Sequence, residues 1–217
     1  MSTQEKVIFY GGLVVAIILH EISHGVVALF FGDDTAKRAR RLTLNPIPHI
    51  DPFGSIILPG MLLLAGLLPF GWAKPVPVDP SKLHQPRRDM LFVGLAGPTT
   101  NLALMLGAAY GARVLLHRWV TTHTGVLALD HAPLVAQILF WFAFGNLVLG
   151  IFNLLPIPPL DGSSLIERVL PRRWLPRWYQ FRPYGLLILV LIVFSTHALD
   201  AVLRPFEDAL FRYIQVR

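Results

Sequence analysis

The chain has 217 residues, of which 54% are hydrophobic and 15% are charged, and its formal net charge is +6. A mean hydropathy of +0.56 is too high for an ordinary soluble domain. The sequence contains no cysteine, which excludes disulfides and thiolate metal sites. No basic patch with interleaved aromatic residues indicates nucleic-acid binding. We therefore expect an all-α, multi-spanning membrane protein, folded as one helical bundle over residues 1–217.

The first apolar run, residues 7–31, is long enough for a transmembrane helix and contains the motif His-Glu-Ile-Ser-His at residues 20–24. On a helix, His20 and His24 project from one face, as two ligands of one metal ion require. Glu21 is offset by one residue, where it can deprotonate a metal-bound water without being a ligand. Ionisable groups in hydrocarbon are costly without partners, so the motif indicates a functional site. A buried proton relay or a polar contact between helices is the alternative.

The region after this run is irregular. Residues 32–51 are polar and basic, and residues 42–44 alternate like a short strand. Residues 53–71 are apolar but interrupted by proline and glycine, which favours a re-entrant path that enters and leaves on one side. The alternating prolines of residues 71–80 predict an extended edge segment, because proline cannot join a central strand.

The remaining apolar runs complete the bundle. Clear spans are predicted at residues 90–116, 134–155 and 184–203, and residues 204–217 have the pattern of an amphipathic surface helix. We expect a catalytic core over about residues 7–165, followed by a C-terminal span and tail at residues 183–217.

The distribution of lysine and arginine predicts the orientation. The segments that are basic are expected in the cytoplasm, and they cover residues 32–52, 72–89 and 162–182. Residues 117–133 contain a single arginine and are expected outside. This arrangement places the N-terminus outside the cell membrane.

The same topology brings two distant stretches together. The first helix and the span at residues 134–155 both run inward, so His24 and Asp161 reach a similar depth near the cytoplasmic side. Asp161 then completes a His-His-Asp set with His20, leaving a fourth tetrahedral position for water, as catalytic zinc requires. Zinc, or another divalent ion, fits this set at one ion per chain.

Three motifs resemble those of the site-2 protease family of intramembrane zinc metalloproteases. Residues 20–24 resemble its HExxH motif, residues 97–101 its GPxxN motif, and residues 153–162 its NxxPxxxLDG motif. Residues 49–54 and 71–75 are similar to the compact prokaryotic branch of the family. On this resemblance, we expect these residues to form the protease domain without the PDZ or CBS domain of other branches.

The resemblance implies hydrolysis of peptide bonds in membrane-spanning substrates near the cytoplasmic side, for regulated proteolysis or membrane-protein clearance. It assigns zinc binding to His20, His24 and Asp161, and it makes Glu21 the general base. Asn101 is expected near the substrate or the oxyanion. The expected partners are a transmembrane protein or peptide and the lipid bilayer, without nucleic acid, and the oligomeric state is left open.

Two other functional classes fit part of the pattern. A zinc transporter can carry His-Glu-x-x-His on a membrane helix, but Gly25 stands where a second acidic residue is usual. A catalytically inactive scaffold that binds membrane proteins is the third interpretation. The intact Glu21 and the complete ligand set argue against it.

Overall fold

The structure, a computed structural model, describes residues 1–64, 71–122, 132–195 and 198–214. These residues form helices and irregular segments, and no β-strand occurs among them. The helices long and apolar enough to cross a membrane are α1 (Thr3–Phe30), α4 (Pro86–Thr122) and α5 (Leu134–Asn153). They confirm the helical, multi-spanning class and lie where the first three clear spans were predicted.

Helix α1 has a defined start and end. At its start, Glu5 N–H donates to the Ser2 hydroxyl and Ser2 N–H donates to the Glu5 carboxylate, which satisfies two otherwise unpaired groups. The helix stops before Gly32, whose φ of 103° is a conformation that glycine adopts without strain. Its 28 residues span about 42 Å, more than the hydrocarbon thickness of a bilayer.

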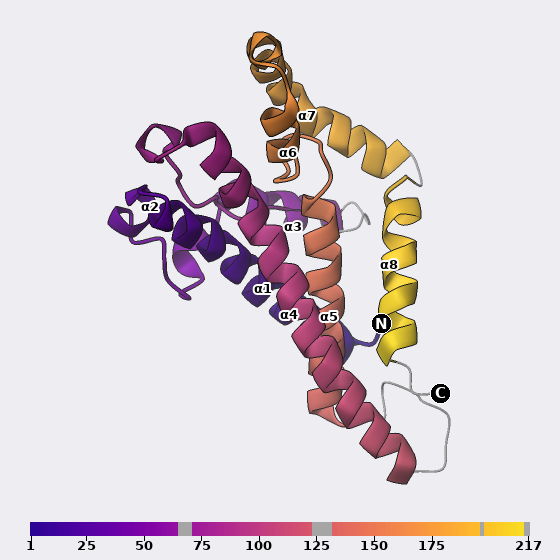
Figure 1. The fold of residues 1–217 in the computed structure, drawn as a ribbon. Coiled ribbons are helices and arrows are strands. Elements are labelled where there is room, and N and C mark those ends of the chain that lie inside the picture. Colours follow the sequence, from indigo (N-terminus) through magenta and orange to yellow (C-terminus); the bar gives the residue numbers. More distant parts are fainter. Residues whose placement is uncertain (65–70, 123–131, 196–197, 215–217) are drawn as a thin grey trace.

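Helices α1, α4 and α5 pack side by side and form the centre of the molecule (Figure 1). Many of their buried residues are small, which lets helix backbones approach closely where no water is present to drive association. The buried alanines of these helices are Ala16 and Ala28 in α1, Ala96, Ala108, Ala109 and Ala112 in α4, and Ala136 and Ala143 in α5.

The C-terminal part differs from the prediction of one span at residues 184–203. Helix α7 (Leu175–Ser195) ends inside that range, and a separate helix, α8 (Ala198–Ile214), follows. Helix α8 is amphipathic, as predicted for the tail, and buries Leu203, Leu210 and Ile214 in a cluster with α4 and α5.

The segment between α1 and α4 returns to its starting point. It contains short helices, namely α2 (Thr35–Arg38), η1 (Ile47–His49), η2 (Pro52–Ile57), α3 (Leu58–Leu64) and η3 (Pro80–Lys82). Trp72 N–H donates to the Gly54 carbonyl at 3.1 Å, and the Ser55 hydroxyl donates to the Trp72 carbonyl at 2.8 Å. Both ends of the apolar stretch therefore meet, as a re-entrant path requires, while residues 65–70 lie outside the described residues.

The predicted edge strand is an extended segment without a β-ladder. Lys74 N–H donates to the His49 carbonyl at 2.9 Å, and the Arg41 guanidinium donates to the Lys74 carbonyl at 2.6 Å. Pro75 and Pro77 carry no N–H, so a regular ladder cannot continue past Lys74. The other strand candidate, residues 42–44, forms bends.

Asp33 fastens the far end of the extended segment to the end of α1. Its carboxylate, fully buried, accepts hydrogen bonds from the N–H and hydroxyl of Thr35 and from the N–H of Asp79. Burial favours the neutral acid, but these hydrogen bonds outweigh it and hold the pKa of Asp33 below its ordinary value. The segment is thus held at both ends.

Candidate metal centre

Three side chains predicted as metal ligands meet at one point. Nε2 of His20 and Nε2 of His24 lie 3.0 Å and 3.3 Å from Oδ2 of Asp161, and 3.1 Å from each other. The histidines are 5% and 8% exposed. Residues separated by more than 130 positions therefore present their ligand atoms together, as the predicted convergence of His24 and Asp161 requires.

The hydrogen bonds of the ring nitrogens fit a cation at this point. Nδ1 of His24 lies 2.6 Å from the Val93 carbonyl, which can only accept, so the proton is on Nδ1. Nδ1 of His20 lies 2.6 Å from Oδ1 of Asn101, also an acceptor. In neutral imidazoles both Nε2 atoms then present lone pairs toward Oδ2 of Asp161, which receives no hydrogen bond from the described residues. Three facing acceptors need a cation, and two imidazoles with a carboxylate suit zinc.

Helix α4 holds both histidines through one stripe of residues at four-residue spacing. Val93 contacts His24 and Asn101 contacts His20. Gly97, between them, lies so close to the imidazole of His20 that a Cβ atom there would overlap the ring. The Gly-Pro-Thr-Thr-Asn motif thus lets α4 approach His20 and places an amide beside Nδ1, one turn further along the helix.

Asp161 is positioned by the turn after α5. The N–H of Gly162 donates to the Asn153 carbonyl at 2.7 Å, and Asn153 itself donates to the Leu149 carbonyl at 3.0 Å. Helix α6 (Ser163–Val169) follows directly, and its C-terminal carbonyls accept hydrogen bonds from Arg87 of α4. These contacts fix the chain on both sides of Asp161.

Glu21 is half-buried and held by the main chain of the extended segment. Its Oε2 accepts a hydrogen bond from the N–H of Val76 at 2.8 Å. Gly25, one turn further along α1, packs so tightly that a Cβ atom would crowd Leu42, Ala36 and Val76. The extended segment is therefore held directly against the helix that carries His20 and His24.

Asn101 has contacts that differ from those expected of a residue facing the substrate. It is fully buried, its Oδ1 faces His20, and its Nδ2 donates to Oδ1 of Asn146 at 2.9 Å. It therefore lies behind His20, on the side away from Asp161, which the motif did not indicate. Gly97 was noted only as part of the motif at residues 97–101, and Asn146 was not singled out from the sequence, although an asparagine inside an apolar span is itself a signal of a buried polar contact.

Comparison with known proteins agrees with this geometry. The sequence model of peptidase family M50 matches residues 120–195, which include Asp161. The chain is 41% identical over 197 residues to a Bacillus subtilis protein named "Putative zinc metalloprotease YwhC", covering 91% of this chain and 84% of that protein.

More distant relatives carry the same description. The protein named Rip2 of Mycobacterium tuberculosis is 34% identical over 188 residues, covering 85% of this chain and 67% of Rip2. Rip2 of Mycolicibacterium smegmatis is 27% identical over 194 residues, with coverages of 87% and 67%. No solved structure matches the chain. The family implied by the three motifs is confirmed: the chain belongs to peptidase family M50, the site-2 proteases, which are zinc metalloproteases of the membrane.

Proposed function

We propose that this protein hydrolyses peptide bonds of membrane-spanning substrates, with one zinc ion held by His20, His24 and Asp161. The observation that carries the proposal is the convergence of three lone-pair atoms inside a bundle of apolar helices. No donor among the described residues satisfies all three, and a zinc ion would.

The side chains divide the chemistry between them. When bound, zinc polarises the scissile carbonyl and lowers the pKa of a coordinated water. Glu21 takes the proton of the attacking water and delivers it to the leaving amine. Its hydrogen bond from Val76 directs one carboxylate oxygen and leaves Oε1 for this task. Asn101 and the Val93 carbonyl keep the imidazoles in the tautomer that presents Nε2 to the metal.

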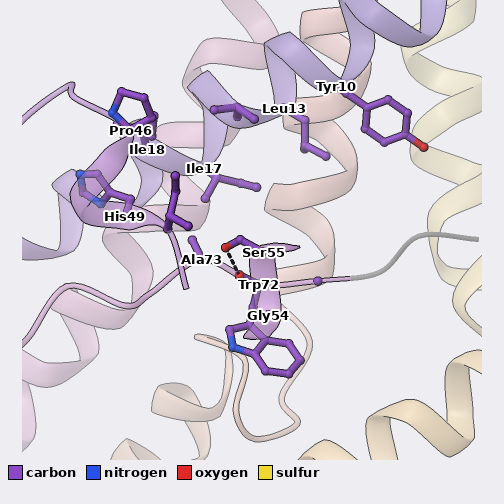
Figure 2. Close-up of a pocket in the computed structure, with 13 residues that line it drawn as sticks. Tyr10, Leu13, Ile17, Ile18, Pro46, His49, Gly54, Ser55, Trp72 and Ala73 are labelled. Carbon is purple, nitrogen blue, oxygen red and sulfur yellow. Dashed lines mark hydrogen bonds between the residues drawn. The ribbon is translucent and has the colours of Figure 1, made fainter. Parts of the chain in front are cut away.

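An apolar groove of about 430 Å³ begins one helical turn before the metal ligands. Figure 2 shows Leu13, Ile17 and Ile18 of α1 on one side of it, and Trp72 beside Gly54 on the other. We propose that apolar side chains of the substrate occupy this groove. Ile17 is four residues from Glu21. The substrate side chains in the groove would therefore belong to residues a few positions from the scissile bond.

A helical substrate must unwind before its carbonyls can be attacked, and it then needs new hydrogen-bond partners. The extended segment at residues 72–78 continues from the groove to Val76 beside Glu21. We propose that the unwound substrate lies along this segment, with residues 42–44 as the other candidate.

The orientation proposed for the membrane follows the charge distribution. Residues 32–52, 72–89 and 162–182 are basic and are proposed to face the cytoplasm with the active site, while the N-terminus lies outside. Because the chain has no cysteine, single cysteines introduced at Ser81 and Thr122 can be labelled from outside intact cells. We expect labelling at Thr122 only, and labelling at Ser81 would refute the orientation.

The decisive experiment compares the wild type with Glu21→Gln on a membrane-tethered peptide. The proposal predicts metal-dependent cleavage that the substitution lowers by about 10²–10⁴-fold, the usual contribution of a general base. Zinc content should be unchanged and close to one ion per chain. A zinc transporter or an inactive scaffold would give no cleavage in either protein. Proteomics of membrane fractions from cells that carry the wild type or Glu21→Gln would then identify substrates.

A further inference from the structure

Two asparagines lie fully buried between apolar helices, and one of them does not touch a metal ligand. Asn101 of α4 contacts His20, whereas Asn146 of α5 contacts only Asn101 and its own helix in the hydrogen bonds described. Both side chains are 0% exposed. A buried amide is costly unless it is fully hydrogen-bonded, so the position of Asn146 requires an explanation.

The hydrogen bonds fix which end of each amide points in which direction. Nδ2 of Asn146 donates at 2.9 Å to the Phe142 carbonyl, which can only accept. Oδ1 of Asn146 must then face Asn101, whose Nδ2 donates to it at 2.9 Å. This leaves Oδ1 of Asn101 to face Nδ1 of His20 at 2.6 Å. The order of donors and acceptors therefore runs from one backbone carbonyl of α5 to the imidazole.

We infer that Asn146 is a positioning residue that sets the tautomer of His20 through the amide orientation of Asn101. This inference rests on the proposed zinc site. With Asn146 in place, His20 carries its proton on Nδ1 and offers the Nε2 lone pair to the metal.

Loss of the Asn146 acceptor would free the Asn101 amide to rotate. A rotated amide would donate from Nδ2 to Nδ1 of His20 and so favour the tautomer with the proton on Nε2, which leaves no lone pair on Nε2 for the metal. The only other acceptor described for Asn101 is the Ala16 carbonyl, at a longer 3.5 Å. A hydrogen bond of that length opposes the rotation weakly.

The two histidines differ in the kind of acceptor that faces Nδ1. Nδ1 of His24 faces the Val93 carbonyl, a main-chain acceptor that cannot be turned round. His20 instead depends on a side-chain amide that has two orientations, and Asn146 selects one of them. A change at Asn146 should therefore act on one ligand of the metal and leave the other intact.

The test is a zinc titration of the full-length, metal-free protein in detergent, in competition with a fluorescent chelator. Asn146→Leu keeps the size of the side chain and removes the acceptor. We expect its zinc affinity to fall by about 10–100-fold, the usual effect of losing a supporting hydrogen bond behind a ligand. Gln137→Leu removes another buried amide from the same helix and should leave zinc affinity unchanged. Wild-type affinity in Asn146→Leu would overturn the inference.

A second background separates orientation from packing. Asn101→Asp places a carboxylate beside His20, and a carboxylate accepts at either oxygen, so it needs no orientation. In that background Asn146→Leu should cost little zinc affinity, whereas an equal loss in both backgrounds would show a packing role and overturn the inference. His20→Ala serves as a separate control. Full zinc binding in His20→Ala would refute the proposed site itself, so the two failures are distinguishable.

Discussion

At the candidate metal centre, the outer nitrogens of His20 and His24 are each held by a group of another helix. The re-entrant segment is instead held through its main-chain groups, which pair with one another or with the side chains of Glu21, Arg41 and Asp33. The centre joins α1, α4 and the turn after α5 through buried side chains. The segment at residues 47–79 closes through backbone hydrogen bonds around Gly54 and Trp72. Several of its apolar side chains are exposed, including Phe53 and Trp72.

This difference matches the two tasks. A metal ion needs its ligands held to within a fraction of an ångström, which packed helices and buried hydrogen bonds provide. A site for varied peptides needs apolar surface and main-chain groups that do not depend on one side chain. We therefore expect substitutions at the centre to change metal affinity, and substitutions in the groove to change substrate preference.

The largest effect is expected at Asp161. Asp161→Asn keeps the size of the side chain but removes the negative charge that faces both imidazoles. We expect zinc affinity to fall by more than about 100-fold, the upper limit for residues that only support a ligand. Elemental analysis of the purified protein measures its zinc content, which should be lower than that of the wild type. Asp208→Asn, on the exposed face of α8, is the control, and equal zinc content in both variants would contradict the ligand set.

The next effect tests how closely α4 must approach α1. Gly97→Ala would push a methyl group into the ring of His20, and we expect zinc affinity to fall by about 10–100-fold. Gly107→Ala lies on the same helix, where an added Cβ meets nothing within 4 Å. Chelator competition should show no change for this control. Similar affinities for both variants would mean that the close approach at Gly97 is not needed.

A smaller effect, on substrate preference, is expected in the apolar groove. Ile17→Trp would fill the groove that we propose for apolar substrate side chains. We expect kcat/KM for peptides with large apolar residues to fall roughly tenfold relative to alanine-containing peptides, as for other changes in pocket size. Zinc affinity should stay at the wild-type value. Val15→Trp, an exposed position outside the groove, is the control, and a uniform loss across peptides would contradict the assignment.

The smallest effect concerns the anchor of the extended segment. Asp33→Asn should destabilise the protein by about 1.5–3 kcal/mol near neutral pH, the range for hydrogen bonds to a charged group. Because the pKa of Asp33 is below its ordinary value, its stabilisation is present above that value and is lost as the pH falls through the lowered pKa. The difference from wild type in thermal unfolding should therefore shrink in acid. Asp34→Asn weakens only solvent-accessible pairs with Arg38 and Lys82 and should cost less at every pH.

The sequence predicted that His20, His24 and Asp161 converge, because their placement depends on rules that act along the chain. Helical periodicity places His20 and His24 on one face, and the alternation of spans places Asp161 at their depth. The re-entrant path followed from charge and parity in the same way. None of these arguments needed the distance between helices.

What the sequence did not indicate depends on contacts between helices. The bond between Glu21 and Val76, and the place of Asn101 behind His20, follow from how close the elements lie. The bounds predicted for the final span differ from the helices because the apolar pattern was extended across Ser195 into residues of a second, amphipathic helix. Periodicity gives the faces of helices, but it does not give the partners that meet across them.

The bond between Val76 and Glu21 has a consequence for which peptides the enzyme can accept. The stretch from Pro75 to Pro77 has a single main-chain donor, the N–H of Val76, and Glu21 already holds it. A peptide aligned here finds carbonyl oxygens alone and must supply the N–H groups itself. Proline supplies none. The enzyme would therefore discriminate against proline at these substrate positions through its backbone, whatever side chains the groove admits.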